Sequence, residues 1–254
     1  MQITDKKYLP TFQKTIGTEL ERWFSAHEFI SFSVDLGYRN QVSAVFSSNI
    51  EGNSVDLNTY LNSVINAQKL KPGKEVEEIN DLVRAYEFAQ ANALTEQNLL
   101  QAHRLMSKTF LIKAKLGKYR TDRMGVFDSD GLVYLAIEDR FIGEKMAELF
   151  ADIETLRNRN LDLVAAFYHA SIIHLKFVHI HPFWDDNGRS ARLLEKWFLA
   201  EAINGRAWKL QSEKYYKEHL ADYYKNINLG VNYYELDYDK CMPFLLMLPR
   251  SLKS

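Results

Sequence analysis

Apolar residues recur at three- and four-residue spacing along most of this chain, which is the period of an amphipathic helix. The pattern predicts helices over residues 8–36, 56–70, 75–93, 95–111, 140–159, 190–204, 213–227 and 238–248. Residues 161–180 are apolar on nearly every face and therefore predict a buried central helix. Local signals mark several ends: Thr95 is a plausible N-cap, Pro72-Gly73 stops one helix and Gly205 closes another.

Residues 117–139 break the helical period. They contain Gly125, a turn-like run from Asp128 to Gly131, and a β-rich stretch at 132–137, which together predict a short hairpin. Only 5 prolines and 11 glycines occur in 254 residues, which favours long helices over a turn-rich β fold. We expect an all-α fold with a small β-hairpin, in one domain over residues 1–254 with no accessory domain.

Composition excludes several classes of protein. The formal net charge of −1 lacks the basic excess of a dedicated nucleic-acid binder. Cys241 is the single cysteine, so the chain has no internal disulfide and a reducing cytoplasmic location is expected. The first ten residues lack a signal-peptide core. No apolar run approaches the roughly 18 residues of a membrane span, so no membrane association is expected.

The stretch HPFWDDNGRSAR, from His181 to Arg192, has a composition unlike that of an ordinary helix or loop. Proline ends the helix before it, and the backbone amides that open the next helix form an anion site. Arg189 and Arg192 suit a polyphosphate, and Asp185 suits Mg²⁺ beside phosphates. His181 can take a proton near neutral pH. Together these groups indicate nucleotide chemistry with base activation of a nucleophile.

Each of these residues alone also has a structural explanation. Asp-Asn-Gly is common turn chemistry, and arginine and aspartate frequently form capping or salt-bridge networks. Asn187 can bond ligand oxygens or tolerate a left-handed turn, and Gly188 lets the backbone approach a ligand closely. The combination within twelve residues favours the functional interpretation.

These residues resemble the signature of the Fic family, His-x-Phe-x-(Asp/Glu)-Gly-Asn-Gly-Arg-x-x-Arg. The resemblance implies a Fic-fold helical bundle and transfer of AMP from ATP to a protein hydroxyl. It implies that His181 is the base, that Phe183 anchors the loop and that Asp185 binds Mg²⁺. The phosphates would be held by the loop and its arginines, at Asn187, Gly188, Arg189 and Arg192.

Asp186 departs from the family pattern, which has glycine at this position. The substitution adds a Cβ and a negative charge beside the phosphate site, where like charges cost about 1 kcal/mol in water at roughly 4 Å and more at lower dielectric. Asp186 is therefore expected either to turn outward or to join the phosphate and nucleotide site as an extra metal ligand.

An upstream segment, SSNIEGNSV, contains Ser47, Glu51 and Gly52. Read locally, it is a helix end with Gly52 as its cap. Beside the Fic signature it resembles the inhibitory pattern (Ser/Thr)-x-x-x-Glu-(Gly/Asn) of the class with an N-terminal inhibitory helix, here at about 40–53. That resemblance implies that Glu51 pairs with Arg192 and displaces the γ-phosphate, while Ser47 helps to fix the helix.

Other segments resemble the family more weakly. GKYRTD, at 117–122, is similar to the segment before the target-binding flap, and the flap would be formed by Val133, Tyr134, Leu135 and Ala136. A flap pairs with a target backbone by strand addition. ADYYKN is similar to a double tyrosine near the adenine, so Tyr223 or Tyr224 would stack on the base, although core aromatics on a helix explain it equally.

Four histidines lie between residues 169 and 181. His169, His174 and His179 are five residues apart, which rotates each by about 140° from the previous one on an ideal helix. Buried or capping roles are therefore expected instead of a zinc site, and His103 also has the pattern of a core residue.

The leading hypothesis is a protein adenylyltransferase that uses ATP and Mg²⁺, is repressed by Glu51, and acts on a target protein that presents a Ser, Thr or Tyr hydroxyl. Self-modification and a homo-oligomer are compatible with the sequence. Two alternatives stay open: transfer of another nucleotide or phosphate group, and a catalytically weak nucleotide- or partner-binding module.

Overall fold

The computed structural model describes residues 2–26, 36–66, 73–129 and 131–253. Parts of the predicted helices (27–35 and 67–70), the stop residue Pro72 and turn residue 130 lie outside the described residues. The longer helices are α1 (Leu9–Ala26), α2 (Leu36–Ile50), α3 (Leu57–Ile65), α4 (Lys74–Ala91), α5 (Glu96–Met106), α6 (Ile142–Arg157), α7 (Leu163–Ile180) and α8 (Asn187–Ala202). The C-terminal part contains α9 (Ser212–Glu218), α10 (Leu220–Ile227), α11 (Met242–Leu245) and α12 (Met247–Arg250).

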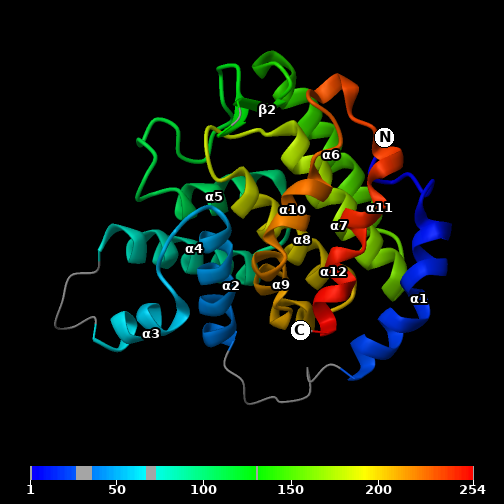
Figure 1. Cartoon of the computed structure of the whole chain (residues 1–254), viewed down its shortest axis with the longest axis horizontal. Coiled ribbons are helices and arrows are strands. Elements are labelled where there is room, and N and C mark those ends of the chain that lie inside the picture. The colour runs from blue at the N-terminus through cyan, green and yellow to red at the C-terminus, as the bar shows by residue number, and fades with distance from the viewer. Residues whose placement is uncertain (1, 27–35, 67–72, 130, 254) are drawn as a thin grey trace.

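Helices α7 and α8 form the centre of the bundle, and the other helices surround them (Figure 1). Fifteen of the 18 residues of α7 are buried, as its uniformly apolar sequence predicts. Helix α2 packs against α4 and α9 and also contacts α8. This contact matters for the site because it brings the end of α2 to the beginning of α8.

Helix α7 is also the one helix, within the described residues, that is long and apolar enough to cross a membrane. The expectation that no segment reaches this length is therefore wrong, because α7 is 18 residues long and contains a single charged residue, Lys176. In the fold, 83% of this window is buried against other helices. Central helices of folded domains meet the same criteria, so the finding is weak evidence for a span.

Side-chain caps set several helix starts. Asp56, Thr95 and Asp162 each accept a hydrogen bond from the backbone N–H three residues later, which confirms the predicted N-cap at Thr95. Helix α7 ends at His181, whose left-handed backbone (φ 53°) is followed by Pro182. This turn is what places the signature residues in a loop between α7 and α8.

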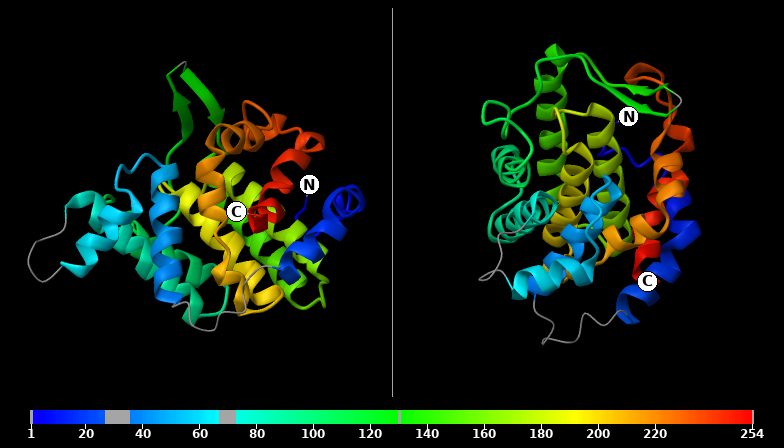
Figure 2. Two further views of the ribbon diagram at one scale, coloured as in Figure 1. Left: turned by 60° about the horizontal axis from the view of Figure 1, so that its bottom comes forward. Right: turned by 60° about the vertical axis from the view of Figure 1, so that its left-hand side comes forward.

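The predicted hairpin is present as β1 (Gly125–Asp128) and β2 (Gly131–Leu135), paired antiparallel. A register shift between Val126 and Phe127 leaves Val133 as an extra residue on β2. The hairpin extends away from the bundle and reaches over the α10 side of the molecule (Figure 2).

The predicted helix over 213–227 is broken into α9 and α10 at His219. The backbone of His219 leaves the helical region (φ −116°, ψ 40°), and its ring nitrogen bonds the Tyr215 carbonyl at 2.9 Å while the ring stacks on Tyr215. A side chain that binds the carbonyl of the preceding turn competes with the helix. Apolar periodicity does not register such a bend, because the break depends on one side chain and not on the spacing of apolar residues.

Candidate active site

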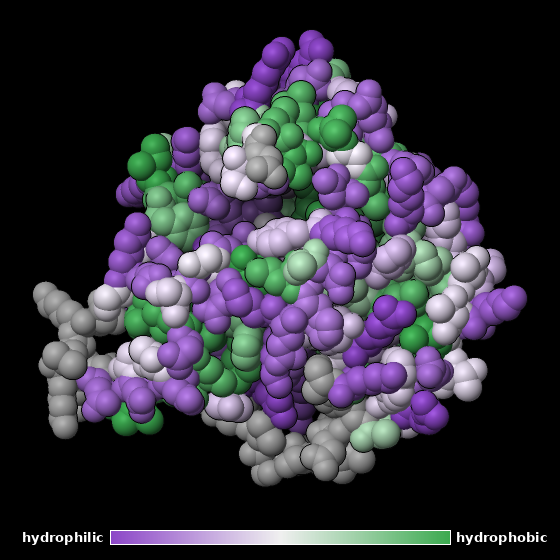
Figure 3. All heavy atoms as spheres, in the orientation of Figure 1, coloured by the Kyte–Doolittle hydropathy of each residue, from purple (hydrophilic) through white to green (hydrophobic). Residues whose placement is uncertain are grey.

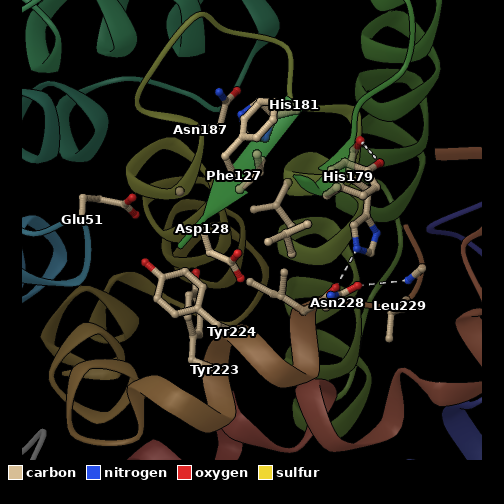
Figure 4. Close-up of a pocket in the computed structure, with 17 residues that line it drawn as sticks. Glu51, Phe127, Asp128, His179, His181, Asn187, Tyr223, Tyr224, Asn228 and Leu229 are labelled. Carbon is tan, nitrogen blue, oxygen red and sulfur yellow. Dashed lines mark hydrogen bonds between the residues drawn. The ribbon is translucent and has the colours of Figure 1, made fainter. Parts of the chain in front are cut away.

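One cavity of about 510 Å³ lies between the hairpin, the α7–α8 loop and α10. Its volume is in the range of small-molecule sites. Figure 4 shows His181 and Asn187 on one side, Tyr223 and Tyr224 on another, and the Glu51 carboxylate pointing inward. The site residues predicted from sequence that line it are Glu51, Val133, Tyr134, His181, Asn187, Gly188, Tyr223 and Tyr224.

The loop between α7 and α8 is held by its own side chains. The Asn187 amide accepts a hydrogen bond from the Phe183 N–H and donates one to the Phe183 carbonyl, both at 2.9 Å. The amide is thus committed to the loop, and Asn187 has the ordinary helical backbone of the first residue of α8. Its contribution to ligand binding is therefore to shape the loop rather than to offer a free amide.

Phe183 anchors the loop in the core, as the resemblance implies. Its ring is fully buried and stacks on His103, with ring centroids 3.7 Å apart. His103 accepts a hydrogen bond from the Gly117 N–H at Nδ1, so its Nε2 carries the proton and faces the Asp185 carbonyl at 3.3 Å. The predicted core position of His103 is confirmed.

Arg120 ties the loop to the base of the hairpin. Its guanidinium is almost fully buried and donates to three backbone carbonyls, those of His181, Asp122 and Ile137, at 2.5–2.7 Å. Its backbone N–H donates to the Pro182 carbonyl. The sequence showed Arg120 in the GKYRTD segment, but nothing in the local pattern revealed that it connects the two parts of the site.

The imidazole of His181 faces the cavity at the end of α7 (Figure 4). Burial lowers its pKa to about 4, an effect that the Val178 carbonyl and the Glu51 carboxylate partly oppose. The imidazole is therefore neutral at pH 7, the state in which it accepts a proton. Because this pKa is well below 7, His181 is a weak base that depends on its position next to the nucleophile.

Glu51 forms an ion pair with Arg192 across 141 residues of sequence. The Glu51 Oε1 atom is 2.6 Å from Arg192 Nη2, and the Arg192 side chain is fully buried. Arg192 also donates to the Ser47 hydroxyl and the Ser47 carbonyl, at 2.9 and 3.0 Å. Burial raises the pKa of Glu51, but the charge and hydrogen bond of Arg192, together with the charges of Arg189 and His181, outweigh it, so the net pKa is lowered and the carboxylate is ionised.

The Glu51 carboxylate sits against the first turn of α8. A Cβ built on Gly188 would lie 2.2 Å from Glu51 Oε1, so glycine is what lets the carboxylate approach this helix. Gly52, with φ +94°, ends α2, and the Asn53 N–H donates to the Ser48 carbonyl in the pattern of a helix C-cap. The carboxylate thus occupies the place at a helix N-terminus where an anion binds most favourably.

A buried chain of hydrogen bonds stabilises Arg192 from behind. Arg192 Nη1 donates to the Tyr223 hydroxyl at 3.1 Å, and that hydroxyl is 3.0 Å from His174 Nε2. His174 Nδ1 is 2.9 Å from Glu195, which also accepts from the Tyr216 hydroxyl. Since the Tyr223 hydroxyl accepts from Arg192, its proton is free for His174, and His174 then donates to Glu195.

Tyr223 is thus largely committed to this network. Its side chain is 1% exposed, whereas Tyr224 is 47% exposed and bonds the Ile50 carbonyl through its hydroxyl. Both residues line the cavity. Tyr224 offers more ring surface for a stacked base, so of the two predicted tyrosines it fits that role better.

Asp186 turns inward, which neither alternative from the sequence anticipated. Its backbone keeps the left-handed conformation that glycine would adopt (φ 61°), and its side chain is 3% exposed. The carboxylate lies 2.5 Å from Arg189 Nη1 and 2.6 Å from the Ser107 hydroxyl. Within the described residues, neither Asp186 nor Arg189 lines the cavity. The side chains of Asp186 and Arg189 therefore do not lie in the phosphate site that the sequence predicts for them.

The buried Asp186 carboxylate predicts a pH-dependent stability. Burial raises its pKa to about 6, although Arg189 and Ser107 act in the opposite direction. A raised carboxyl pKa means that the folded state binds the proton more tightly, so this contribution to stability grows as pH falls through 6 and is lost as pH rises. Compared with Asp186→Asn, the free energy of unfolding of the wild type should rise by about 1.3 kcal/mol more between pH 7 and pH 5. Urea unfolding at both pH values measures this, and equal slopes for the two proteins would contradict it.

Asp185 is exposed and lies outside the residues that line the cavity. Its Oδ1 atom accepts the Asp186 N–H at 2.7 Å, which orients the carboxylate at the start of α8. No group of three or more His, Cys, Asp or Glu side chains suited to a metal occurs in the part of the chain that is described. Mg²⁺ commonly uses one carboxylate with phosphates and water, so Asp185 fits a ligand of a nucleotide-bound cation.

The four predicted flap residues differ in what they offer. Val133 and Tyr134 line the cavity, and the Tyr134 hydroxyl donates to the His179 carbonyl at 2.6 Å. The Leu135 N–H already donates to Val231, and the Ala136 N–H to Met124. Backbone addition by a target at Leu135 and Ala136 therefore has fewer free donors than the sequence predicts.

Exposed apolar side chains gather on the hairpin, at Val126, Phe127, Leu132 and Leu135. In the space-filling view a hydrophobic group lies near the top of the molecule, below a hydrophilic edge, in the region where β2 lies in Figure 1 (Figure 3). Phe127 is 70% exposed and also lines the cavity. These side chains form an apolar rim beside the entrance to the cavity.

The histidines of α7 have the expected buried roles. His169 lies 2.8 Å from the Ile3 carbonyl, and His179 lies within 3.0 Å of both Tyr238 and the Ile227 carbonyl. His174 belongs to the chain behind Arg192. The residues that sequence reasoning missed, Ser107, Arg120, His174, Glu195 and Tyr216, have partners far along the chain and gave no local signal.

Comparison with known proteins agrees with this geometry. Residues 93–199 match the family model described as "Fic/DOC family". The chain is 29% identical over 169 residues to a "Protein adenylyltransferase Fic" of Nematostella vectensis, covering 62% of this chain and 37% of that protein. It is 25% identical over 156 residues to "Protein adenylyltransferase fic-1" of Caenorhabditis elegans, covering 57% and 28%. The chain thus spans less than half the length of these relatives.

Solved structures share the fold. A Fic family protein from Desulfovibrio desulfuricans has a TM-score of 0.78 at 24% identity, covering 95% of this chain and 73% of that one. Fic-1 from C. elegans has a TM-score of 0.69 at 18% identity, covering 96% and 71%. The helical bundle with its hairpin is therefore the Fic fold, as predicted. The signature residues 181–192 lie inside the region, residues 93–199, that matches the Fic/DOC family.

Proposed function

We propose that this protein is an adenylyltransferase that moves AMP from ATP to a hydroxyl side chain of another protein. The observation that carries the proposal is that the His181 imidazole and the N-terminus of α8 face one cavity, beside an exposed hairpin. A base and an anion site that face the same cavity suit attack of a hydroxyl on a phosphate. The names of the curated relatives support the same activity.

In the proposed reaction, neutral His181 accepts the proton of the target hydroxyl. The hydroxyl oxygen forms a bond to the α-phosphorus, the bond from that phosphorus to the β-bridging oxygen breaks, and pyrophosphate leaves. Backbone N–H groups at the start of α8, shaped by Asn187 and Gly188, stabilise the charge on the phosphates. Bound Mg²⁺, with Asp185 as a ligand, would supply further neutralisation of the phosphate charge.

We further propose that Glu51 represses this activity. Glu51 lines the cavity and pairs with Arg192, which does not line it, against the first turn of α8, so a donor phosphate that approaches Arg192 must displace the carboxylate. A chain with this pair intact is expected to transfer slowly. The hairpin would receive the target through Val133 and the apolar rim.

Transfer of another phosphate-containing group is the second candidate, favoured by the pairing of Asp186 with Arg189. Incubating the wild type and Glu51→Gly with ATP labelled at the α- or the γ-phosphate separates the candidates. AMP transfer predicts label on protein from the α-phosphate only. Label from the γ-phosphate only would indicate phosphorylation, and nucleotide binding without any label would indicate a binding module.

A further inference from the structure

Each arginine of the signature has its own internal carboxylate. Arg192 is paired with Glu51 at 2.6 Å, and Arg189 is paired with Asp186 at 2.5 Å. Counting these four side chains, the start of α8 and its partners carry two positive and two negative charges. In the proposed function only the ion pair of Glu51 and Arg192 has to open. The ion pair of Asp186 and Arg189 has no role in it.

The two pairs differ in their freedom to open. The Glu51 side chain is 31% exposed and is attached at the end of α2, so it can leave by rotation. The Asp186 side chain is fully buried, and its second oxygen is held by the Ser107 hydroxyl at 2.6 Å. Its attachment in the loop before α8 leaves it no path to solvent without moving the loop.

Arg189 is further fixed by its surroundings. Its guanidinium lies over the Phe110 ring, with the Cζ atom 5.2 Å from the ring centroid. Its buried Nε atom has no hydrogen-bond partner among the described residues. An unsatisfied buried N–H costs stability, so the orientation of this guanidinium is imposed by the Asp186 contact and not by a complete set of its own partners.

We propose that Asp186 is a specificity-determining residue that keeps Arg189 from contacting the nucleotide donor. As a result, the cavity binds nucleoside diphosphates and triphosphates with similar affinity. The inference rests on the proposed nucleotide site. With Glu51 displaced, one guanidinium, that of Arg192, is free to meet the distal phosphates. A nucleoside diphosphate then gains nearly as much as a triphosphate, because the third phosphate finds no second guanidinium.

The test is calorimetric titration with AMP, ADP and ATP, in the presence of Mg²⁺, in a Glu51→Gly background that opens the first pair. We expect ATP and ADP to bind this variant within about threefold of each other. Adding Asp186→Gly should strengthen ATP binding by about tenfold over ADP, the effect of one charge-assisted contact. Asp186→Asn, which keeps a neutral acceptor and tolerates the left-handed backbone, should give an intermediate ratio.

Ser107→Ala in the same background is the matched control. It removes the neighbouring hydrogen bond to Asp186 and leaves the ion pair, so the ratio of ATP to ADP affinity should stay as in Glu51→Gly. A tenfold or larger preference for ATP in Glu51→Gly alone would overturn the inference, as would an Asp186 substitution that shifts all three nucleotides equally. Those outcomes leave the proposed function standing, whereas a failure of every variant to bind nucleotide would overturn both.

Discussion

Replacing His181 with alanine should lower the rate of AMP transfer by about 10²- to 10⁴-fold, the usual contribution of a general base. The imidazole is neutral at pH 7, because burial lowers its pKa to about 4, and it faces the cavity next to the anion site. It acts on the incoming hydroxyl and not on the donor. ATP binding should therefore change by less than tenfold. Transfer of labelled AMP and calorimetric ATP binding, both in the Glu51→Gly background, measure the two quantities.

Lys14→Ala is a suitable control for this experiment. Lys14 is exposed on α1 and lies outside the residues that line the cavity, so its replacement should leave transfer unchanged. Wild-type rates in His181→Ala would refute the role of His181 as the base. Loss of both transfer and binding in His181→Ala would instead show that this residue supports the loop.

Replacing Glu51 with glycine should raise AMP transfer by roughly ten- to a hundredfold. A charge-assisted pair of this kind contributes about 1.5–3 kcal/mol, and productive ATP has to displace it. The first modified protein should be the enzyme itself, because its own hydroxyls, including those of 14 tyrosines, are at hand. Mass spectrometry after incubation with ATP and Mg²⁺ detects the added AMP.

Two variants show whether the charge of Glu51 is responsible. Glu51→Gln keeps the length of the side chain and removes its charge, so it should activate partly. Arg192→Ala should not activate, because it removes the partner of the phosphate together with the inhibitory ion pair. If Glu51→Gly binds ATP and yet modifies neither itself nor proteins of a lysate, Glu51 is only the end of a helix and its pair with Arg192 is structural.

The fold was largely predictable because its helices carry their own signals. The apolar face of α7 and the cap at Thr95 depend on neighbouring residues, which a single sequence displays. The break at His219 was missed because it depends on one side chain that bonds its own preceding turn. The sequence analysis missed that α7 is long and apolar enough to cross a membrane, because histidines and a serine interrupt its apolar run. The mean hydropathy of the helix nevertheless meets the criterion for a span.

The site was predictable where its residues are adjacent in sequence. The signature loop placed His181 and Gly188 without any structure, whereas the contact of Glu51 with Arg192 came from a family resemblance and not from a local pattern. The inward turn of Asp186 required Ser107, which lies 79 residues earlier and has no feature that marks it. Long-range partners of this kind decide which side chains reach a cavity, and one sequence does not reveal them.

The hydrogen bonds of Arg120 to the hairpin have a consequence for which parts of this protein can change in sequence. The buried Arg120 guanidinium joins the loop of His181 to the two ends of the hairpin segment, at Asp122 and Ile137. The position of His181 is therefore fixed relative to the base of the hairpin and not to its tip. Under the proposed function, substitutions of the exposed side chains of the hairpin, such as Phe127 and Leu132, should change which protein surface is recognised, while Arg120 keeps the loop of His181 in place. Recognition of the target and activation of its hydroxyl can then vary independently of each other.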